Sequence, residues 1–545
     1  MIAGIDNIKK IMSKVFKEFD ILDDIEIRYS NIEGIDIQCN NLIRYSKNKN
    51  LTKIKEAIES ELSNNTYIEK IDINDKNFIN LTFSNTYLLD HSSSAEKRIK
   101  EVKDESVIFD YGGPNIGKDL HVGHIRTLNI GRSLYNIYKR AGYKVISDIH
   151  FGDWGKPIGL ILAYLEEKEI SLDTLTYSDL EVIYPRANNL SQENESFNDK
   201  AKEISKQLNS ENKIYIQKWK HIHNLAIPNI KKLLNKLDHK FDWYFGESDA
   251  IKEVSTVVNE AISKGLLIED SGALISTEEA DPPILVTKSD GSYLYLTTDL
   301  GTVYFREQQQ KFNKYVYVVD SRQKNHFEQL FKTVKYFDLS NAMFVHVGFG
   351  TVNGPGNKPF KTRDGGVYKL DTLYEDIKKK LKKYNDDEKI LNTLTNTVLT
   401  YSDLLPNRNQ NYVFDLDKFT DINGKTGIYI QYAQVRAKKL LGKSNSIQNK
   451  NYISRFNNEE RQLRLLITKF TYYFNLSKNN YEPHHLADYL YTLCQSFNSF
   501  YAKNKIFSDN ISDEKKAIRI QIVKDFYNTS CLVSDCLGIK LVDSM

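Results

Sequence analysis

The chain has 545 residues, of which 40% are hydrophobic and 27% are charged, a composition typical of globular proteins. This length predicts about three or four domains. The formal net charge of +3 is close to neutral, so it neither requires nor excludes a nucleic-acid partner. No apolar run approaches the ~20 residues of a membrane span and the N-terminus does not resemble a signal peptide, so we expect a cytoplasmic protein with no membrane partner. The cysteines lack paired spacing, which favours free thiols: Cys39, Cys494, Cys531 and Cys536.

The first hundred residues predict a small α+β domain. Apolar residues recur at helical spacing over residues 8–19 and again over 51–62, which predicts two amphipathic helices. Alternating apolar residues over 79–83 predict a strand. The polar and charged stretch over 91–105 is typical of a linker to the next domain.

The most informative stretch runs from Val107 to Gly155. An apolar triplet beginning at Val107 predicts a buried strand, which a pair of glycines ends. An amphipathic run then predicts a helix that Gly142 terminates, and a second strand follows over 143–149. Strand, loop, helix and strand in this order predict a right-handed βαβ unit, with the loop at the carboxyl edge of a parallel sheet.

The loop of this unit carries side chains that suit a phosphate group. A helix N-terminus attracts phosphate through its unpaired N–H groups. His121 and His124 are three residues apart, so both can face one side of the first turn, and Gly123 between them lets a flat group approach the backbone. With Lys118, the two imidazoles can stabilise charge that builds up on phosphorus. Two alternatives are a metal site, which would lack a third His or Cys nearby, and a helix start with incidental histidines.

Further signals follow in the central region. Residues 241–248 carry acidic groups among aromatic ones, which suits either a pocket for a planar cation or a core strand with exposed carboxylates. A β-rich run ending in an acid is predicted over 293–299, and apolar strands over 316–320 and 345–350. The glycines at the last of these lack the Gly-x-Gly-x-x-Gly pattern, because position 353 is Asn, so we reject a dinucleotide fingerprint.

A basic segment, residues 358–363, lies between two pairs of glycines. Lys358, Lys361 and Arg363 fall within these six residues. Such a loop can close on a triphosphate and neutralise the departing pyrophosphate. The alternative is a solvated basic turn, which is the commoner fate of a short charge run.

The chain from about residue 385 onward is predicted to be almost entirely helical. Two apolar stripes, over 463–474 and 486–500, are typical of core-facing helices. A helix beginning near Gly427 carries tyrosines and Arg436, residue types on which RNA bases stack.

Three motifs carry a resemblance to a known family: Pro114–Lys118, His121–Arg126 and Gly152–Gly155. They closely resemble class I aminoacyl-tRNA synthetases, specifically the arginyl-tRNA synthetase family. The resemblance implies an α/β nucleotide-binding (Rossmann-like) catalytic domain over residues 101–385. It also implies an additional α+β N-terminal domain over 1–100 that contacts the tRNA elbow, and an all-α anticodon-binding domain over 386–545. The implied reaction is ATP-dependent ligation of L-arginine to tRNA-Arg through an arginyl-adenylate.

The resemblance also implies site residues. Catalytic roles fall on His121, His124, Lys118, Lys358 and Lys361. ATP binding falls on Gly123, His121, His124, Gly350 and Phe360. Arginine binding falls on Asp110, Asn115, Tyr295, Asp299, Gln323 and Glu247. Binding of tRNA falls on Tyr429, Gln431, Tyr432 and Arg436.

The implied partners are tRNA-Arg, L-arginine and ATP with Mg²⁺ as a substrate, with no tightly bound cofactor and no resident metal. A guanidinium group needs planar acceptors, which the acidic candidates can supply. We expect a monomer. Four residues depart from those usual in the family, which keeps a divergent paralogue open: Thr298, Lys288, Gly112 and Gly113. Two alternatives are therefore kept beside the implied reaction. One is a divergent paralogue that activates arginine for another acceptor, and the other is a non-catalytic tRNA-binding regulator.

Overall fold

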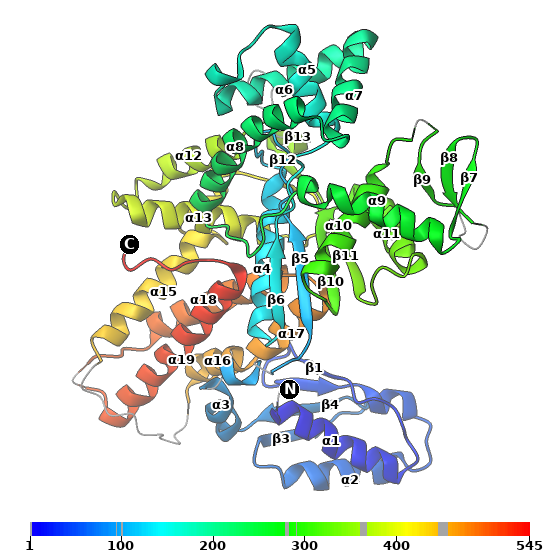
Figure 1. Ribbon diagram of the computed structural model, residues 1–545. Helices are drawn as coiled ribbons and strands as arrows, with labels where there is room; N and C mark the ends of the chain where they lie inside the picture. The colour runs from blue at the N-terminus through cyan, green and yellow to red at the C-terminus, as the bar shows by residue number, and fades with distance from the viewer. Residues whose placement is uncertain are drawn as a thin grey trace. The chain divides into compact units, whose positions relative to one another are not determined.

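The computed structural model describes residues 3–93, 95–99, 102–277, 283–289, 291–359, 368–444, 456–508 and 510–545. The chain forms two compact units (Figure 1). The first comprises Met1–Glu101, Asp421–Cys536 and Lys540–Met545, and the second comprises Val102–Thr420 and Leu537–Ile539. The division into domains over 1–100, 101–385 and 386–545 stays a prediction, and residues 386–420 lie in the second unit.

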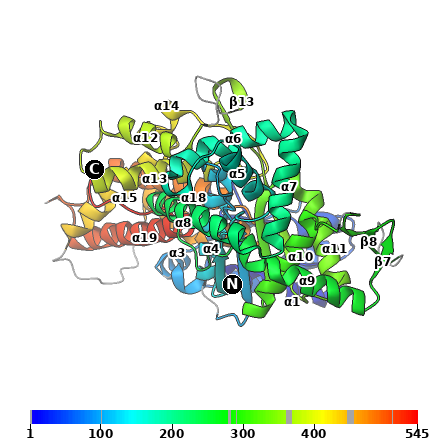
Figure 2. The same cartoon turned by 45° about the horizontal axis from the view of Figure 1, so that its top comes forward.

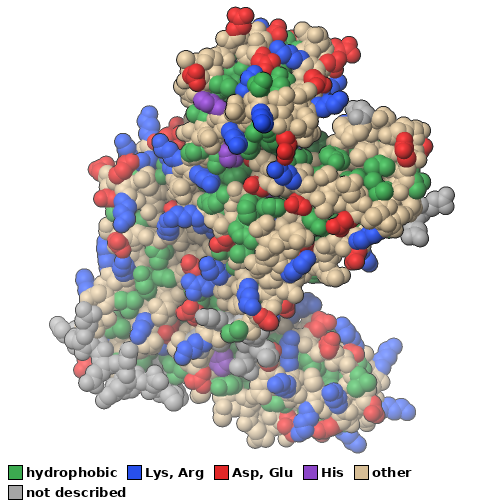
Figure 3. All heavy atoms as spheres, viewed as in Figure 1, with side chains coloured by type: hydrophobic (Ala, Val, Ile, Leu, Met, Phe, Trp, Pro, Cys, Tyr) green, Lys and Arg blue, Asp and Glu red, His purple; other side chains and the backbone are tan. Residues whose placement is uncertain are grey.

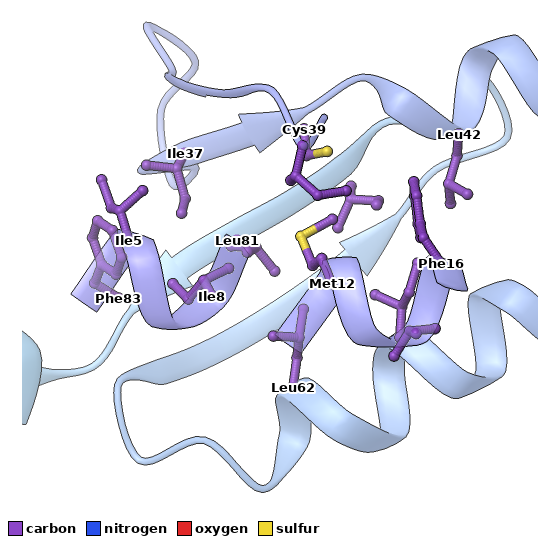
Figure 4. Close-up of a cluster of buried hydrophobic side chains, with 14 of the residues drawn as sticks. Ile5, Ile8, Met12, Phe16, Ile37, Cys39, Leu42, Leu62, Leu81 and Phe83 are labelled. Atoms are coloured by element: carbon purple, nitrogen blue, oxygen red, sulfur yellow. The ribbon is translucent and has the colours of Figure 1, made fainter. Parts of the chain in front are cut away.

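The N-terminal part of the first unit packs helices on an antiparallel sheet of order β1-β2-β4-β3. The strands are β1 (Ile27–Tyr29), β2 (Ile37–Cys39), β3 (Ile68–Ile73) and β4 (Ile79–Phe83). The helices are α1 (Ala3–Glu18), η1 (Asn41–Tyr45), α2 (Leu51–Ser63), α3 (Asn85–Ser92) and η2 (Glu96–Arg98). Figure 4 shows the core between α1, α2 and the sheet, where Met12 and Leu62 lie near Leu81. The apolar face predicted over residues 8–19 is shorter than expected, because α1 ends at Glu18, before Phe19. Phe16 is the fully buried phenylalanine at this end of the helix.

The described residues in the rest of the first unit are mainly helical, as predicted. Its helices are α15 (Gly427–Gly442), α16 (Asn458–Thr468), α17 (Phe470–Asn480), α18 (His484–Lys503) and α19 (Asp513–Leu537). The stripe predicted on α18 is fully buried, and its Phe497 stacks on Phe526 of α19 with ring centroids 4.0 Å apart. An ion pair joins this part to the N-terminal part, because Arg461 contacts both carboxylate oxygens of buried Asp36, at 3.0 and 2.5 Å.

The second unit is built on a four-stranded sheet of order β11-β10-β5-β6, in which every pair is parallel. Its strands are β5 (Ser106–Tyr111), β6 (Lys144–Asp148), β10 (Lys314–Asp320) and β11 (Met343–Phe349). Helix α4 (His124–Arg140) connects β5 to β6, and Gly142 follows it with φ 96°. The predicted βαβ order is therefore confirmed, and the three apolar residues Val107, Ile108 and Phe109 of β5 are fully buried.

One predicted strand is wrong. The run over 293–299 is mostly helical, because α10 spans Tyr295–Gln309. Tyr293 alone keeps a β-bridge, to Thr287. The residues Leu296, Leu300 and Val303 recur at helical spacing and are buried, so packing of this face decided the structure over the β propensity of the tyrosines and threonines.

Helices inserted after β6 form the upper part of the second unit in Figure 1, and Figure 2 shows them from a second side. They are α5 (Lys156–Glu167), η3 (Leu172–Thr174), α6 (Tyr177–Glu193), α7 (Glu195–Asn209) and α8 (Lys213–Lys236). Acidic and basic side chains intermix on the face of these helices seen in Figure 3.

The remaining elements of the second unit surround the sheet. The helices are α9 (Glu247–Ser263), η4 (Ser321–Gln323), α11 (Lys324–Tyr336), η5 (Pro355–Asn357), α12 (Leu370–Leu381), α13 (Glu388–Leu404) and α14 (Leu416–Phe419). The additional strands are β7 (Leu267–Asp270), β8 (Ala273–Ser276), β9 (Leu285–Thr287), β12 (Val352–Gly354), β13 (Lys358–Pro359) and β14 (Tyr412–Val413). None of the described helices combines the length and apolarity that a bilayer span needs. No disulfide joins any of the four cysteines, which all lie within the described ranges.

Candidate active site

A cavity of about 720 Å³ opens in the second unit at the carboxyl ends of three parallel strands. Asp110 and Tyr111 reach it from β5, Asp320 from β10 and Phe349 from β11. The turn before α4 lines it as well. This is the edge where open parallel sheets bind ligands, and where the sequence predicted the phosphate-binding loop.

The two imidazoles of this turn are fixed by backbone donors. The N–H of His121 donates to Nδ1 of His124 at 3.1 Å, and the N–H of Gly123 donates to Nδ1 of His121 at 3.0 Å. Because each Nδ1 accepts a hydrogen bond, the proton of each neutral ring lies on Nε2. The ring centroids are 4.1 Å apart, so the two donors form a pair beside the cavity.

Electrostatics keep both rings neutral. Burial and the neighbouring His121 lower the pKa of His124 to about 3, and burial with the charge of Lys118 lowers the pKa of His121. At neutral pH the pair therefore offers two N–H donors without adding positive charge. Oxygens of a phosphate group can accept from such donors.

Two glycines of the site are required by close contacts. A Cβ on Gly123 would lie 2.7 Å from Cε1 of His121, and a Cβ on Gly350 would lie 2.6 Å from Oδ1 of Asn411. Gly350 lines the cavity and donates its N–H to the carbonyl of Arg408 at 2.8 Å. Here glycine serves close packing of the protein against itself, in addition to the ligand access expected from the sequence.

Two of the lysine candidates, Lys118 and Lys358, are not among the residues that line the cavity. The ammonium of Lys118 sits 5.0 Å from the ring centroid of Tyr184 in α6. Lys358 is exposed in β13. Two other candidates from the basic segment, Phe360 and Lys361, lie outside the described residues.

Three of the arginine-binding candidates line the cavity: Asp110, Asp299 and Gln323. The other three do not. Asn115 forms a β-bridge with Gly152, Tyr295 is 76% exposed at the start of α10, and Glu247 begins α9.

Glu247 nevertheless interacts with the cavity through charge. Burial and the negative charges of Asp299 and Asp153 raise its pKa to about 8. The segment around it, residues 241–248, is neither a plain strand nor a plain loop, since Trp243 and Gly246 form isolated bridges that continue from β6. The two interpretations of this segment, a pocket for a planar cation and a core strand with exposed carboxylates, both stay predictions.

Sequence reasoning missed Arg306, which is 1% exposed and lines the cavity. Its guanidinium contacts Asp110 at 2.6 Å and Asp148 at 2.7 Å, and so joins the ends of β5 and β6. It also assigned no role to His326, whose Nε2 lies 2.6 Å from Oδ2 of Asp299. Arg306 follows Asp299 by seven residues on α10, so a helical interpretation of this run would have placed both on one face.

The tRNA-binding candidates on α15 differ in exposure, since Gln431 is buried in the protein and Tyr432 reaches the surface. Gln431 is fully buried and donates to the carbonyl of Lys540 at 2.6 Å. Arg436 lies 4.6 Å from the ring centroid of the partly exposed Tyr432, and donates to Asn498 at 2.6 Å. Tyr429 packs on Tyr491, with ring centroids 5.3 Å apart. Tyr432 and Arg436 thus form a surface on which a base can stack.

One alternative interpretation of His121 and His124 is a metal site. The potential ligands that lie within 4.8 Å of one another in the described ranges are Glu482, His484 and His485, all in the first unit. The pair at the cavity therefore has no third ligand among the described residues.

Family models match most of the chain. The catalytic domain of class I (R) tRNA synthetases matches residues 86–416. The DALR anticodon binding domain matches residues 430–545, and the arginyl tRNA synthetase N terminal domain matches residues 5–83. The predicted fold class, an α/β catalytic domain with an α+β N-terminal and an all-α C-terminal domain, is confirmed by these matches.

Similar proteins cover the chain nearly end to end. An arginine–tRNA ligase of Francisella tularensis (strain SCHU S4 / Schu 4) is 31% identical over 578 residues, with 99% of each chain covered. Another, of Alkaliphilus oremlandii (strain OhILAs), is 33% identical over 550 residues, with 93% of each covered. The arginyl-tRNA synthetase structure from Plasmodium falciparum matches with a TM-score of 0.81 and 26% identity over 99% of each chain. The enzyme from Thermus thermophilus, at 17% identity, matches in fold with a TM-score of 0.82 over 99% of this chain and 100% of that one. The chain belongs to the arginyl-tRNA synthetase family, within class I of the aminoacyl-tRNA synthetases.

Proposed function

We propose that the chain ligates L-arginine to tRNA-Arg in two steps. In the first, an oxygen of the arginine carboxylate attacks the α-phosphorus of ATP, and pyrophosphate leaves. In the second, a hydroxyl of the terminal tRNA adenosine attacks the arginyl carbonyl, and AMP leaves. The observation that carries this proposal is one cavity that combines neutral imidazole donors with carboxylates.

The nucleotide is proposed to lie over the turn before α4. His121 and His124 donate from Nε2 to phosphate oxygens, and Gly123 and Gly350 keep the backbone accessible. Neutral donors suit this position because they stabilise charge that develops at phosphorus without having to lose a proton. Lys118, Lys358 and Lys361 are proposed to neutralise the phosphates, and Phe360 to contact ATP. Mg²⁺ enters with ATP as part of the substrate.

Arginine is proposed to bind at the acidic side of the cavity. Glu247 and Asp299 are the candidates for the guanidinium, which presents five N–H donors in a plane. Asp110, Asn115, Tyr295 and Gln323 complete the proposed set. Lysine cannot satisfy a fork of acceptors, so the pair of acids favours arginine over other cations.

The transfer RNA is proposed to contact two parts of the chain. The aromatic and cationic side chains of α15, Tyr429, Tyr432 and Arg436, would stack with anticodon bases, with Gln431 beside them. Residues 1–100 would contact the tRNA elbow. The proposal also includes a monomeric chain in the cytoplasm, with no tightly bound cofactor.

Charging of purified tRNA-Arg with labelled arginine tests the proposal. We expect acid-precipitable arginine that depends on ATP and tRNA, and ATP–pyrophosphate exchange that depends on arginine. Exchange without charging would favour a paralogue that serves another acceptor. Binding of tRNA with neither activity would favour a regulator. Asp299→Asn should raise the KM for arginine by about a hundredfold, because an unpaired guanidinium is left at the site.

A further inference from the structure

Helix α9 is preceded by a residue whose side chain cannot cap it. Its N-cap is Gly246, which has no side chain to accept from the unpaired N–H groups of the first turn. Asp153, from the loop after β6, accepts instead. Its Oδ1 receives the backbone N–H of Ser248 at 2.9 Å, and its Oδ2 receives the hydroxyl of Ser248 at 2.6 Å.

The carboxylate of Asp153 is tightly enclosed. It is 1% exposed, and a Cβ on Gly246 would lie 2.5 Å from its Oδ1, so only glycine allows this approach. On the other side, Nε2 of His223 in α8 lies 3.4 Å from its Oδ2. The indole N–H of Trp219 donates to its carbonyl at 2.8 Å. Contacts from α8 therefore fix the position of Asp153, and Asp153 in turn fixes the first turn of α9.

Glu247 is the residue that this arrangement fixes. It is the first residue of α9, and lies between Gly246 and the capped Ser248. Its own N–H donates to the carbonyl of Phe151 at 2.9 Å. Two residues of the loop after β6, Phe151 and Asp153, thus hold the backbone on both sides of the Glu247 side chain.

We propose that Asp153 is a positioning residue for arginine binding, which acts by capping α9 and so fixes Glu247 where it meets the guanidinium. The Gly152–Gly155 motif, to which the proposed reaction assigns no residue, would then serve to position Glu247. The inference rests on the proposed function in its assignment of Glu247 to the substrate. A rigid first turn matters because a carboxylate binds a planar fork only in a narrow range of orientations.

The test compares Asp153→Asn and Ser248→Ala with the unchanged protein. Above the titration of Glu247, at about pH 9, we expect the KM for arginine in tRNA-supported pyrophosphate exchange to rise about tenfold in Asp153→Asn, since a charge-assisted acceptor is lost. The KM for ATP should change less than about twofold, because the imidazole pair lies on another loop. Ser248→Ala, which removes one donor and leaves the charge, should give a smaller rise in the same constant.

Asp179→Asn is the matched control. Asp179 caps α6 with the same donor set, a backbone N–H and a hydroxyl of Thr176 at 2.8 and 2.6 Å, but it is exposed and lies outside the cavity lining. Its loss should leave both KM values unchanged. A purely structural role for Asp153 would instead raise both KM values together, or lower kcat alone.

A pH profile separates positioning from general loosening of the fold. The charge of Asp153 is one of the causes that raise the pKa of Glu247. Arginine affinity should therefore reach its plateau at lower pH in Asp153→Asn, and at unchanged pH in Ser248→Ala. If a folded Asp153→Asn variant kept both the arginine KM and the pH profile of arginine affinity, this inference would be overturned and the proposed function would stand. If the unchanged protein bound no arginine in calorimetry, the proposed function would fall and this inference with it.

Discussion

The backbone N–H of His121 donates to Nδ1 of His124 across 3.1 Å, so the first residue of the motif sets the tautomer of the last. The consequence is a neutral ring with its proton on Nε2, beside the cavity. His124→Ala removes this donor. We expect the rate of ATP–pyrophosphate exchange to fall by about 10²–10³-fold, the usual effect of losing one donor that stabilises developing charge.

His221→Ala is the control for His124, because His221 is an exposed histidine of α8 and lies outside the cavity lining. Its exchange rate should equal that of the unchanged protein. An exchange rate in His124→Ala within twofold of that control would remove the imidazole from the proposed chemistry.

The central part of this site could be predicted from the sequence because its signals are local. Glycines mark the end of β5 and the end of α4, and three consecutive apolar residues mark β5 itself. The motif at His121 then falls at the carboxyl edge of the sheet by topology alone. Asp299 and Gln323 follow from the family resemblance and not from a local pattern, and both line the cavity.

Contacts between distant segments could not be predicted in this way. Arg306 meets Asp110 from 196 positions away in the chain, and Ser248 meets Asp153 from 95 positions away. Neither pair leaves a periodic pattern, since each depends on where two loops or helices come together in the folded chain. The helix α10 was missed for a different reason, because its first turn is rich in residues of high β propensity.

Arginine binding should depend on pH through Glu247. Burial and the charges of Asp299 and Asp153 raise the pKa of Glu247 to about 8, so the free protein carries a neutral acid there at pH 7. A guanidinium binds the carboxylate form, and therefore arginine affinity should increase as pH rises from 6 to 8. The increase should approach about tenfold per pH unit well below the pKa, with a plateau above it. Isothermal titration calorimetry with arginine, in buffers of different ionisation enthalpy, measures the affinity and the released proton.

A second group contributes to the same profile. The hydrogen bond to Asp299 raises the pKa of His326, and the protonated ring competes with the guanidinium for that carboxylate. Glu247→Gln should bind arginine more weakly and lose the part of the profile near pH 8. His326→Asn should keep that part and lose the dependence at lower pH. If Glu247→Gln kept the full profile, the titrating acid would lie elsewhere.

Arg306 should be needed for stability of the second unit. It is buried between two carboxylates, Asp110 and Asp148, with contacts of 2.6 and 2.7 Å. Arg306→Met keeps most of the volume but leaves two buried acids without a cation. We expect the free energy of unfolding to fall by about 3 kcal/mol, as when one partner of a buried ion pair is removed. Thermal unfolding followed by calorimetry measures the loss.

Arg322→Met provides the comparison for Arg306. Arg322 also contacts an aspartate, Asp320, at 2.7 Å, but its side chain is 81% exposed. Solvent screens such a pair, so the change in unfolding free energy should stay below about 1 kcal/mol. Equal losses in the two variants would show that burial of Arg306 contributes nothing beyond an ordinary surface pair.

The first unit should depend on the pair formed by Asp36 and Arg461. Asp36 is 2% exposed, and its carboxylate accepts from Arg461 at 3.0 and 2.5 Å and from the N–H of Phe83 at 2.7 Å. Asp36→Asn keeps the shape but removes the charge from a two-pronged contact. We expect the free energy of unfolding to fall by about 3 kcal/mol.

A double-mutant cycle with Arg461→Gln isolates the interaction between Asp36 and Arg461 from the other effects of each change. The coupling free energy should exceed about 1 kcal/mol, because both groups are largely removed from solvent and joined by two hydrogen bonds. Asp23→Asn, at an exposed contact of 3.3 Å with Arg44, should lower the unfolding free energy by less than about 1 kcal/mol. A coupling no larger than the effect at Asp23 would mean that other contacts hold the N-terminal sheet against α16. Equilibrium urea unfolding, followed by circular dichroism for each variant of the cycle, supplies these free energies.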